Sequence, residues 1–451
     1  MSNILLIRYS LILVVMLLGA MTAQAGSLSL QQSISLSLQH NRLLKADQYN
    51  VQAAESRQDE AKGHLLPRVD GSYSVMRSNS ALTSFGTKLM QQRVVNADFT
   101  TVSLNNPTAM YNYQPKLTFT LPLYQGGALW SGRKQAEKAL QARSHAHQWL
   151  RQQLIFQTIQ HYIAWLNSNE QLGVAKKALQ ASNYHLKNVQ QMRKRGLLID
   201  SDVMDAQVRR LHSEVKVSQS ENTVAYGRDL LARITATAID AETLPMPIKP
   251  LLLPADMDTL VAQAVNKRPD YQAMIATLGG SRAAVEIEQA AFLPRLSLQA
   301  TQEWNSATLS IRNGNRSVAA VVSMNLFAGG SDLAALHRRQ ADRARLSLNV
   351  DDKRQQIENE VRQARRQLTE SETRSAAEAE VLRQSVSSLR IISLRHTQGL
   401  EKTSTLLDAQ SRLDQARADA IRAHYDITVA KAQLLLVTGY LNQTSLQAGD
   451  K

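Results

Sequence analysis

The chain has 451 residues, of which 43% are apolar, and a formal net charge of +14. It contains no cysteine, which excludes disulfides, thiolate metal sites and a lipid-modified N-terminal cysteine. The basic charge is weak support for nucleic-acid binding, because aromatic residues make up only 5% of the chain and Lys and Arg alternate with Glu, Asp and Gln along helical stretches.

The N-terminus has the pattern of a secretory signal peptide. Arg8 supplies the positive start, Ile12 to Leu18 the apolar core, and Ala23 and Ala25 the small residues of a cleavage site. We therefore predict that the mature chain begins near Gly26. No later run reaches the roughly 20 apolar residues that a membrane-spanning helix needs. We expect an exported chain without a helical anchor.

The rest of the chain contains an internal repeat. The stretch LLPRVDGSYS at 65–74 matches FLPRLSLQAT at 292–301 with a shift of 227 residues. Further on, LPLYQGG at 121–127 matches MNLFAGG at 324–330 with a shift of 203 residues. Self-similarity of this kind indicates that one structural unit occurs twice.

The same shift of 203 residues relates RGLLIDSDVMDAQ at 195–207 to QGLEKTSTLLDAQ at 398–410. From the double glycine onward the two halves therefore align without a gap. The difference between the shifts, 227 minus 203, places 24 extra residues in the first half. They lie within Ala81–Thr108, which we predict to be a long polar loop at the outer surface.

Four of the ten prolines fall in the segment that joins the two halves, which predicts an extended connector without a helix. Each half is predicted to contain a helix, two strands, a very long helix, a turn and a further helix. The predicted domains are a signal peptide at 1–25, a first repeat at 26–233, a Pro-rich linker at 234–255, a second repeat at 256–440 and a C-terminal tail at 441–451. The predicted strands are 66–78, 114–124, 293–304 and 316–327, and the long helices are 128–194 and 331–398.

The predicted strands alternate apolar and polar residues. In the first strand Val69, Tyr73 and Val75 share a face, and in the second Leu121 and Leu123 finish an apolar alternation. A period of two with one apolar face is typical of a sheet that is buried on one side. The long helices differ, because their apolar residues follow the narrow 3-4 spacing of coiled coils.

Residues 331–398 contain neither Gly nor Pro, so these 68 residues could extend for about 100 Å as a helix. Four strands cannot close a barrel alone, since single-chain barrels begin at about eight strands. An exported chain of this kind could cross an outer membrane if several copies each contributed a segment to one barrel.

These features together resemble the TolC family of outer-membrane channel proteins. The resemblance rests on the two halves in tandem, the LPR before each first strand, the aromatic-x-Gly-Gly junction in each half, and the Gly and Asp-Ala-Gln at each turn. It implies a mainly α fold with a membrane β-barrel portion: a homotrimer with a twelve-stranded barrel in outer-membrane lipid and a helical tunnel through the periplasm. It also implies two partners, a periplasmic adaptor (membrane fusion) protein and an inner-membrane transporter that exports drugs, metals, other small molecules or proteins.

In this family the strand-to-helix junction joins barrel and tunnel. Tyr124 and Phe327 stand where barrels carry an aromatic girdle at the interface. The glycines that follow supply backbone freedom, including positive φ, for leaving a tilted strand and entering a helix. These junction glycines are Gly126, Gly127, Gly329 and Gly330.

The resemblance places a periplasmic gate at the two turns. Aspartates that pinch the family's tunnel shut align with Asp202 and Asp408, and Asp205 lies one helical turn from Asp202. The tyrosine and arginine of some members' closing link align with His396 and Glu401. The alternative is that the aspartates stabilise helix N-termini, where negative charge is favourable.

Each turn also carries a Gly-Leu pair, Gly196-Leu197 in the first and Gly399-Leu400 in the second. These pairs could dock the hairpin tips of an adaptor. The alternative is that they are ordinary glycines at helix C-termini.

Two other classes of protein are less consistent with the sequence. An enzyme is not expected, because no HExxH, GxSxG, Walker or dinucleotide pattern occurs, and we expect no catalytic residue, metal or cofactor. A soluble periplasmic coiled-coil adaptor would need one helical hairpin flanked by β-rich domains, whereas this chain has two hairpins in register. Release from membranes by carbonate or high salt would favour the adaptor, and extraction only by detergent the channel.

Overall fold

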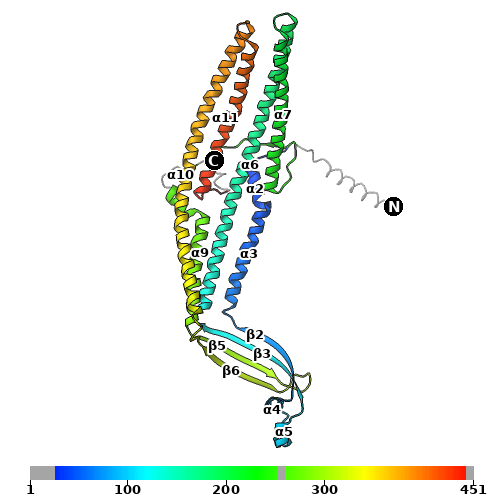
Figure 1. Cartoon of the computed structure of the whole chain (residues 1–451), viewed down its shortest axis with the longest axis vertical. Coiled ribbons are helices and arrows are strands. Elements are labelled where there is room, and N and C mark those ends of the chain that lie inside the picture. The colour runs from blue at the N-terminus through cyan, green and yellow to red at the C-terminus, as the bar shows by residue number, and fades with distance from the viewer. Residues whose placement is uncertain (1–25, 252, 254–259, 443–451) are drawn as a thin grey trace, which may run out of the picture. The chain divides into compact units, whose positions relative to one another are not determined.

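The computed structural model describes residues 26–251, 253 and 260–442, and Figure 1 shows their helices and strands. The predicted signal peptide with Ala23 and Ala25, part of the linker and most of the predicted tail lie outside these residues. The chain divides into two compact units. One consists of Tyr49–His145 and Gln272–Asp352, and contains a four-stranded sheet.

The sheet combines one hairpin from each repeat. Its strands are β2 (Arg68–Ser78), β3 (Met110–Gln125), β5 (Arg295–Trp304) and β6 (Gly314–Ser323), in the order β2-β3-β5-β6 with every pair antiparallel. The two repeats therefore meet at the β3–β5 pairing (Figure 1). The outer strands β2 and β6 each have one edge without a partner among the described strands. This unit confirms the expected strands.

The register of the sheet separates apolar from polar residues across all four strands. One row of partners is Val69, Phe119, Ala300 and Val318. The neighbouring row, whose side chains point to the opposite face, is Asp70, Thr118, Thr301 and Ser317. The sheet thus has one apolar face and one polar face, and the apolar side chains Val69 and Val318 are exposed.

A register shift near the end of β3 changes one detail of the predicted alternation. Pro122 pairs with Ser297, but the next pair joins Tyr124 to Leu296, so Leu123 is the extra residue of a bulge. Tyr124 therefore takes the apolar-face position opposite Leu296, and the strict alternation predicted through Leu123 is interrupted by the bulge. A bulge beside Pro122 is reasonable, because proline cannot donate a ladder hydrogen bond.

The connection between β2 and β3 is partly helical, so the prediction of a long polar loop at Ala81–Thr108 is wrong. It contains the helix α4 (Ala81–Met90), a short 3-10 helix (Asn96–Phe99) and the helix α5 (Thr101–Asn105). Thr100 caps α5 by accepting a hydrogen bond from the Ser103 amide at 3.3 Å.

Besides α4 and α5, parts of four longer helices belong to the unit that contains the sheet. Parts of α3 (Arg42–Gly63), α6 (Ala128–Lys194), α9 (Pro269–Gln289) and α10 (Ser331–Thr397) belong to it. The start of α6 is tied to α9 because Ser131 donates a hydrogen bond to Glu286 at 3.0 Å.

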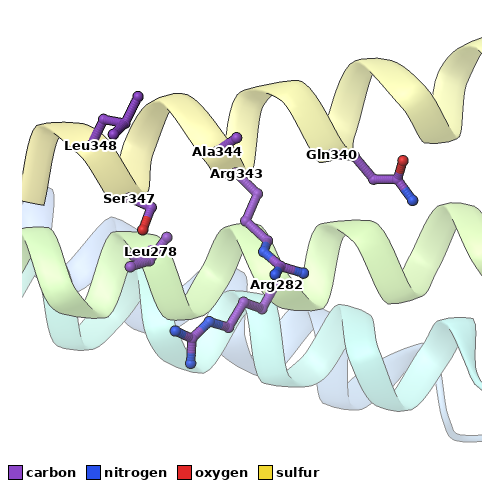
Figure 2. A pocket seen from close by; sticks show the side chains of 7 residues that line it. All are labelled: Leu278, Arg282, Gln340, Arg343, Ala344, Ser347 and Leu348. Carbon is purple, nitrogen blue, oxygen red and sulfur yellow. The ribbon is translucent and has the colours of Figure 1, made fainter.

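Helices α9 and α10 leave a groove of about 640 Å³ between them (Figure 2). Arg282 and Arg343 line it with their guanidinium groups, and Leu278 and Leu348 with apolar surface. Arg282, Arg343 and Leu348 are exposed in the single chain.

The second unit contains the hydrophobic core of the chain. It comprises the remaining described residues, with α2 (Leu30–His40), α7 (Asp200–Thr235), α8 (Leu260–Lys267), α11 (Thr403–Val437) and most of α6 and α10. Its core lies around α6, where Ile159, Tyr162 and Trp165 are fully buried. From 236 to 251 the described linker has no helix, and its strand β4 (Leu244–Pro245) pairs in parallel with β1 (Ser27–Leu28).

Tyr162 connects this small sheet to the core. Its hydroxyl donates a hydrogen bond to the Leu28 carbonyl at 2.7 Å and accepts one from the Met246 amide at 2.8 Å. Burial raises the pKa of Tyr162 to about 12, so the hydroxyl stays protonated. In the described part of the chain no helix has the length and hydropathy of a membrane span.

Candidate functional site

The two strand-to-helix junctions have the same backbone geometry. Gly126 and Gly127 have φ of 62° and 88°, and their counterparts Gly329 and Gly330 have φ of 61° and 84°. Each pair directly precedes a helix of 67 residues, α6 after the first and α10 after the second. The expected positive φ is confirmed, and it explains the glycines because other residues rarely adopt this region.

The surroundings of the two junctions differ. A Cβ added at Gly126 would lie 2.6 Å from the Ala290 carbonyl oxygen, whereas one added at Gly329 would meet nothing within 4 Å. Gly126 is therefore required by packing as well as by its φ. Both junction aromatics, Tyr124 and Phe327, are exposed, but Phe327 lies beyond the last residue of β6.

The two turns between helices are also built alike. At the first turn the Gly196 amide donates to the Arg193 carbonyl at 2.9 Å and the Leu197 amide to the Met192 carbonyl at 3.0 Å. These are the two hydrogen bonds of a Schellman motif, with Gly196 in the left-handed region at φ 76°.

The second turn repeats this motif 203 residues later. The Gly399 amide donates to the His396 carbonyl at 3.0 Å, and the Leu400 amide donates to the Arg395 carbonyl at 2.9 Å. Gly399 has φ of 73°. Gly196 and Gly399 thus end their helices, which is the alternative to adaptor docking given above. Leu197 and Leu400 are exposed beside them.

At the first turn the acidic residues have partners within the chain. Arg193 forms a bidentate ion pair with Asp200, at 2.8 and 3.1 Å. Asp202 accepts a hydrogen bond from the Ile199 amide at 3.3 Å, which satisfies one free donor at the start of α7. Asp202 is half-buried and Asp205 is exposed. Asp202 therefore does cap its helix, as the alternative interpretation of this residue requires.

The second turn holds the remaining candidate gate residues. His396 Nε2 lies 3.3 Å from the Thr403 hydroxyl, and Glu401 lies 3.6 Å from Arg395. Asp408 is exposed on α11. The His396–Thr403 contact and the Arg395–Glu401 ion pair therefore both stay within this turn and involve none of the candidate aspartates.

A histidine on each hairpin is electrostatically linked to the other. Burial lowers the pKa of His185 on α6, and the neighbouring His396 on α10 lowers it further. Because two imidazolium groups repel, a neutral His185 is the form that this packing favours.

Sequence reasoning missed a buried charged cluster. Arg268 is 1% exposed; its guanidinium holds Asp270 at 2.7 and 3.0 Å and also pairs with Glu360 on α10. Lys353 reaches Asp270 at 3.0 Å. Burial would raise the pKa of Asp270, but hydrogen bonds and charges from Arg268 and Lys353 outweigh it and lower this pKa. The sequence RPD at 268–270 indicates only the start of a helix, since proline is favoured at the first helical position, and no local pattern marks the distant partners Lys353 and Glu360.

Comparison with known proteins agrees with this architecture. The family model described as "Outer membrane efflux protein" matches residues 33–235 and 260–440. The chain therefore belongs to the outer membrane efflux protein family. A curated relative, the alkaline protease secretion protein AprF of Pseudomonas aeruginosa, is 24% identical over 438 residues, which cover 94% of this chain and 87% of the relative.

Solved structures show the same fold at low sequence identity. CusC matches with a TM-score of 0.79 and 18% identity, covering 91% of this chain and 92% of that chain. The Campylobacter jejuni outer membrane channel CmeC matches with a TM-score of 0.79 and 15% identity, covering 94% and 89%. The Neisseria gonorrhoeae outer membrane channel MtrE has a TM-score of 0.74 and 18% identity, covering 92% and 90%.

Family membership settles the class of protein. The chain is a TolC-like outer-membrane channel protein with a periplasmic helical part, and the fold is that of channel proteins rather than enzymes. The soluble adaptor considered above is not favoured, because the family match covers both repeats.

Proposed function

We propose that this chain is the exit duct of a tripartite efflux or type I secretion system, through which substrates pass passively from an inner-membrane transporter to the exterior. Its partners are two further copies of itself, a periplasmic adaptor protein and that transporter. The name of AprF, a protease secretion protein, supports the secretion branch, and the efflux family match supports the other.

One observation carries this proposal: a four-stranded sheet that is apolar on one face and polar on the other, with two unpartnered edges among its described strands. In lipid every backbone group must be paired, so such a sheet can be stable only as part of a closed barrel. Pairing β6 of one copy with β2 of the next satisfies both edges. The apolar face then contacts lipid, and the polar face lines the channel.

We further propose that the helical turns form the periplasmic end of the duct. An α-helix of 67 residues extends for about 100 Å at 1.5 Å per residue, so α6 and α10 are long enough to carry each turn far from the membrane. The acidic groups Asp202, Asp205 and Asp408 would then repeat around a narrow pore, where they favour cations. The exposed Leu197 and Leu400 would meet the adaptor.

Planar bilayer recording tests the channel. The purified full-length protein should insert without a partner and give discrete conductance steps, and it should leave cell membranes only with detergent. Release by carbonate together with the absence of conductance steps would contradict the proposal. Genes for an adaptor and a pump beside this one would support the proposed partners.

A further inference from the structure

The segment between β2 and β3, residues 79–109, is a folded element, which we name the cap. Its helices are held together by a Lys88–Asp98 ion pair at 2.6 Å and by an edge-to-face contact between Phe85 and Phe99, with ring centres 5.7 Å apart. Asp98 also accepts a hydrogen bond from the Val95 amide at 3.0 Å. These contacts link the first and second halves of the cap, so it has a defined shape.

A buried polar network fixes the cap to the sheet. The Gln91 side-chain amide donates to Asn112 at 3.0 Å and to the Tyr111 carbonyl at 2.9 Å. Asn112 donates to Asn305 at 2.8 Å, and Asn313 donates to the Gln91 carbonyl at 2.6 Å. Gln91, Asn112 and Asn305 are all buried. Such a network is stable only when its members are paired, so it holds the cap in one place.

This network lies on the polar face of the sheet. Side chains alternate along a strand, so Asn112 on β3 shares its face with Gln114 and Thr118. Gln114 in turn donates to Glu303 on β5 at 3.0 Å, which confirms that these polar side chains meet on one face. In a closed barrel the polar face is the interior. The cap is therefore anchored on the side of the sheet that faces the channel, away from lipid.

The cap exposes several large apolar side chains. Leu82 is 86% exposed, Val102 73% and Phe99 61%, and Leu89 and Val95 are exposed as well. Five large apolar side chains exposed within about 20 residues are more than a water-facing surface usually carries, and they favour a contact site. If the cap lies over the channel mouth, lipid does not cover these side chains, and contact with another protein surface would remove them from water.

We propose that the caps of neighbouring copies pack against one another through this surface and narrow the outer mouth of the channel. The proposal rests on the proposed function, because a symmetric ring brings the same patch of each copy toward one axis. The charges permit this contact: Lys88, Arg93 and Asp98 are the charged residues of the cap, and Lys88 is already paired with Asp98. In the assembled channel this contact gives the exposed apolar side chains of each cap a protein neighbour in place of water.

The absence of cysteine makes cross-linking a clean test. Leu82→Cys, Phe99→Cys and Val102→Cys are made singly in the full chain and oxidised in intact cells. At least one variant should run as a disulfide-linked dimer on a non-reducing gel. The dimer should not exceed about two-thirds of the chains, since in a three-fold ring one of three equivalent cysteines stays unpaired. Val318→Cys, exposed on the apolar face of the sheet, is the control and should stay monomeric.

A second measurement tests closure. Replacing residues 82–107 by a short Gly-Ser linker should raise the single-channel conductance above that of the unchanged protein while detergent extraction stays the same. Absence of a dimer in all three cysteine variants, or unchanged conductance after the replacement, would overturn the proposal while leaving the channel intact. If the unchanged protein fails to conduct, the proposed function fails, and the cysteine variants still show whether the caps meet.

Discussion

The guanidinium carbon of Arg268 lies 4.8 Å from the centre of the Trp149 ring. Arg268 precedes α9 and Trp149 lies on α6, so this stack links the start of the second repeat to the long helix of the first. Stacking and ion pairing together explain how a charged side chain can be almost fully buried. The same arginine pairs with Asp270 and Glu360.

Replacing Arg268 by alanine should destabilise the protein by about 1–3 kcal/mol, because it removes the main partner of the half-buried Asp270, which keeps only Lys353, and of the partly exposed Glu360. Urea denaturation of the detergent-solubilised protein would show a lower midpoint. Arg282→Ala is the control, since Arg282 is an exposed arginine on α9, the helix that Arg268 directly precedes. Equal midpoints for the two variants would show that the cluster does not stabilise the fold.

Alanine at Gly126 should cost more stability than alanine at Gly329. Both positions have nearly the same φ, 62° and 61°, and this conformation alone costs an alanine about 1–2 kcal/mol. Only at Gly126 would the new Cβ also collide with a backbone oxygen. Thermal unfolding of the two variants compares these effects directly, and equal losses would show that the backbone near Ala290 moves aside.

The double substitution Asp202→Asn with Asp408→Asn should raise single-channel conductance in bilayers. Asparagine retains an oxygen that can accept the Ile199 amide, so the cap of α7 is kept while the negative charge is lost. An unchanged conductance would contradict a role of the two aspartates in the gate and would leave Asp202 with its capping hydrogen bond alone. Asp200→Asn is the matched control, because Asp200 is already neutralised by Arg193.

Acidification should destabilise the protein through His185. The pKa of His185 is lower in the folded chain than in the unfolded one, where it is about 6.5, because burial and His396 disfavour the charged form. Below about pH 6.5 the unfolded state therefore binds more protons, and stability falls as the pH falls. Thermal unfolding at about pH 7.5 and pH 5.5 should show a smaller loss for His185→Gln than for the unchanged protein. His64→Gln, at an exposed position, should behave like the unchanged protein.

The repeat made much of this fold predictable. A shift of 203 residues relates not only the sequence motifs but also the junction glycines, the turn glycines and the starts of α6 and α10. Local chemistry explains this success, because positive φ requires glycine and a long run without Gly or Pro favours a helix.

Long-range polar contacts could not be predicted in the same way. The bond between Asn112 and Asn305 joins residues 193 apart, and no periodicity marks either residue. The cap was therefore expected as a loop, and the bulge at Leu123 was missed because alternation alone does not reveal an extra residue. The partners of Arg268 were missed for the same reason, since Glu360 lies 92 residues away.

The equal lengths of α6 and α10 limit which changes in length the chain can tolerate. Both helices have 67 residues, and removing one residue from a helix shortens it by about 1.5 Å and rotates everything after it by about 100°. A deletion in one helix alone would bring its turn to a different level and direct it to a different side. Insertions and deletions among related chains should therefore occur in both helices together, in steps of about seven residues, which keep the packed faces aligned.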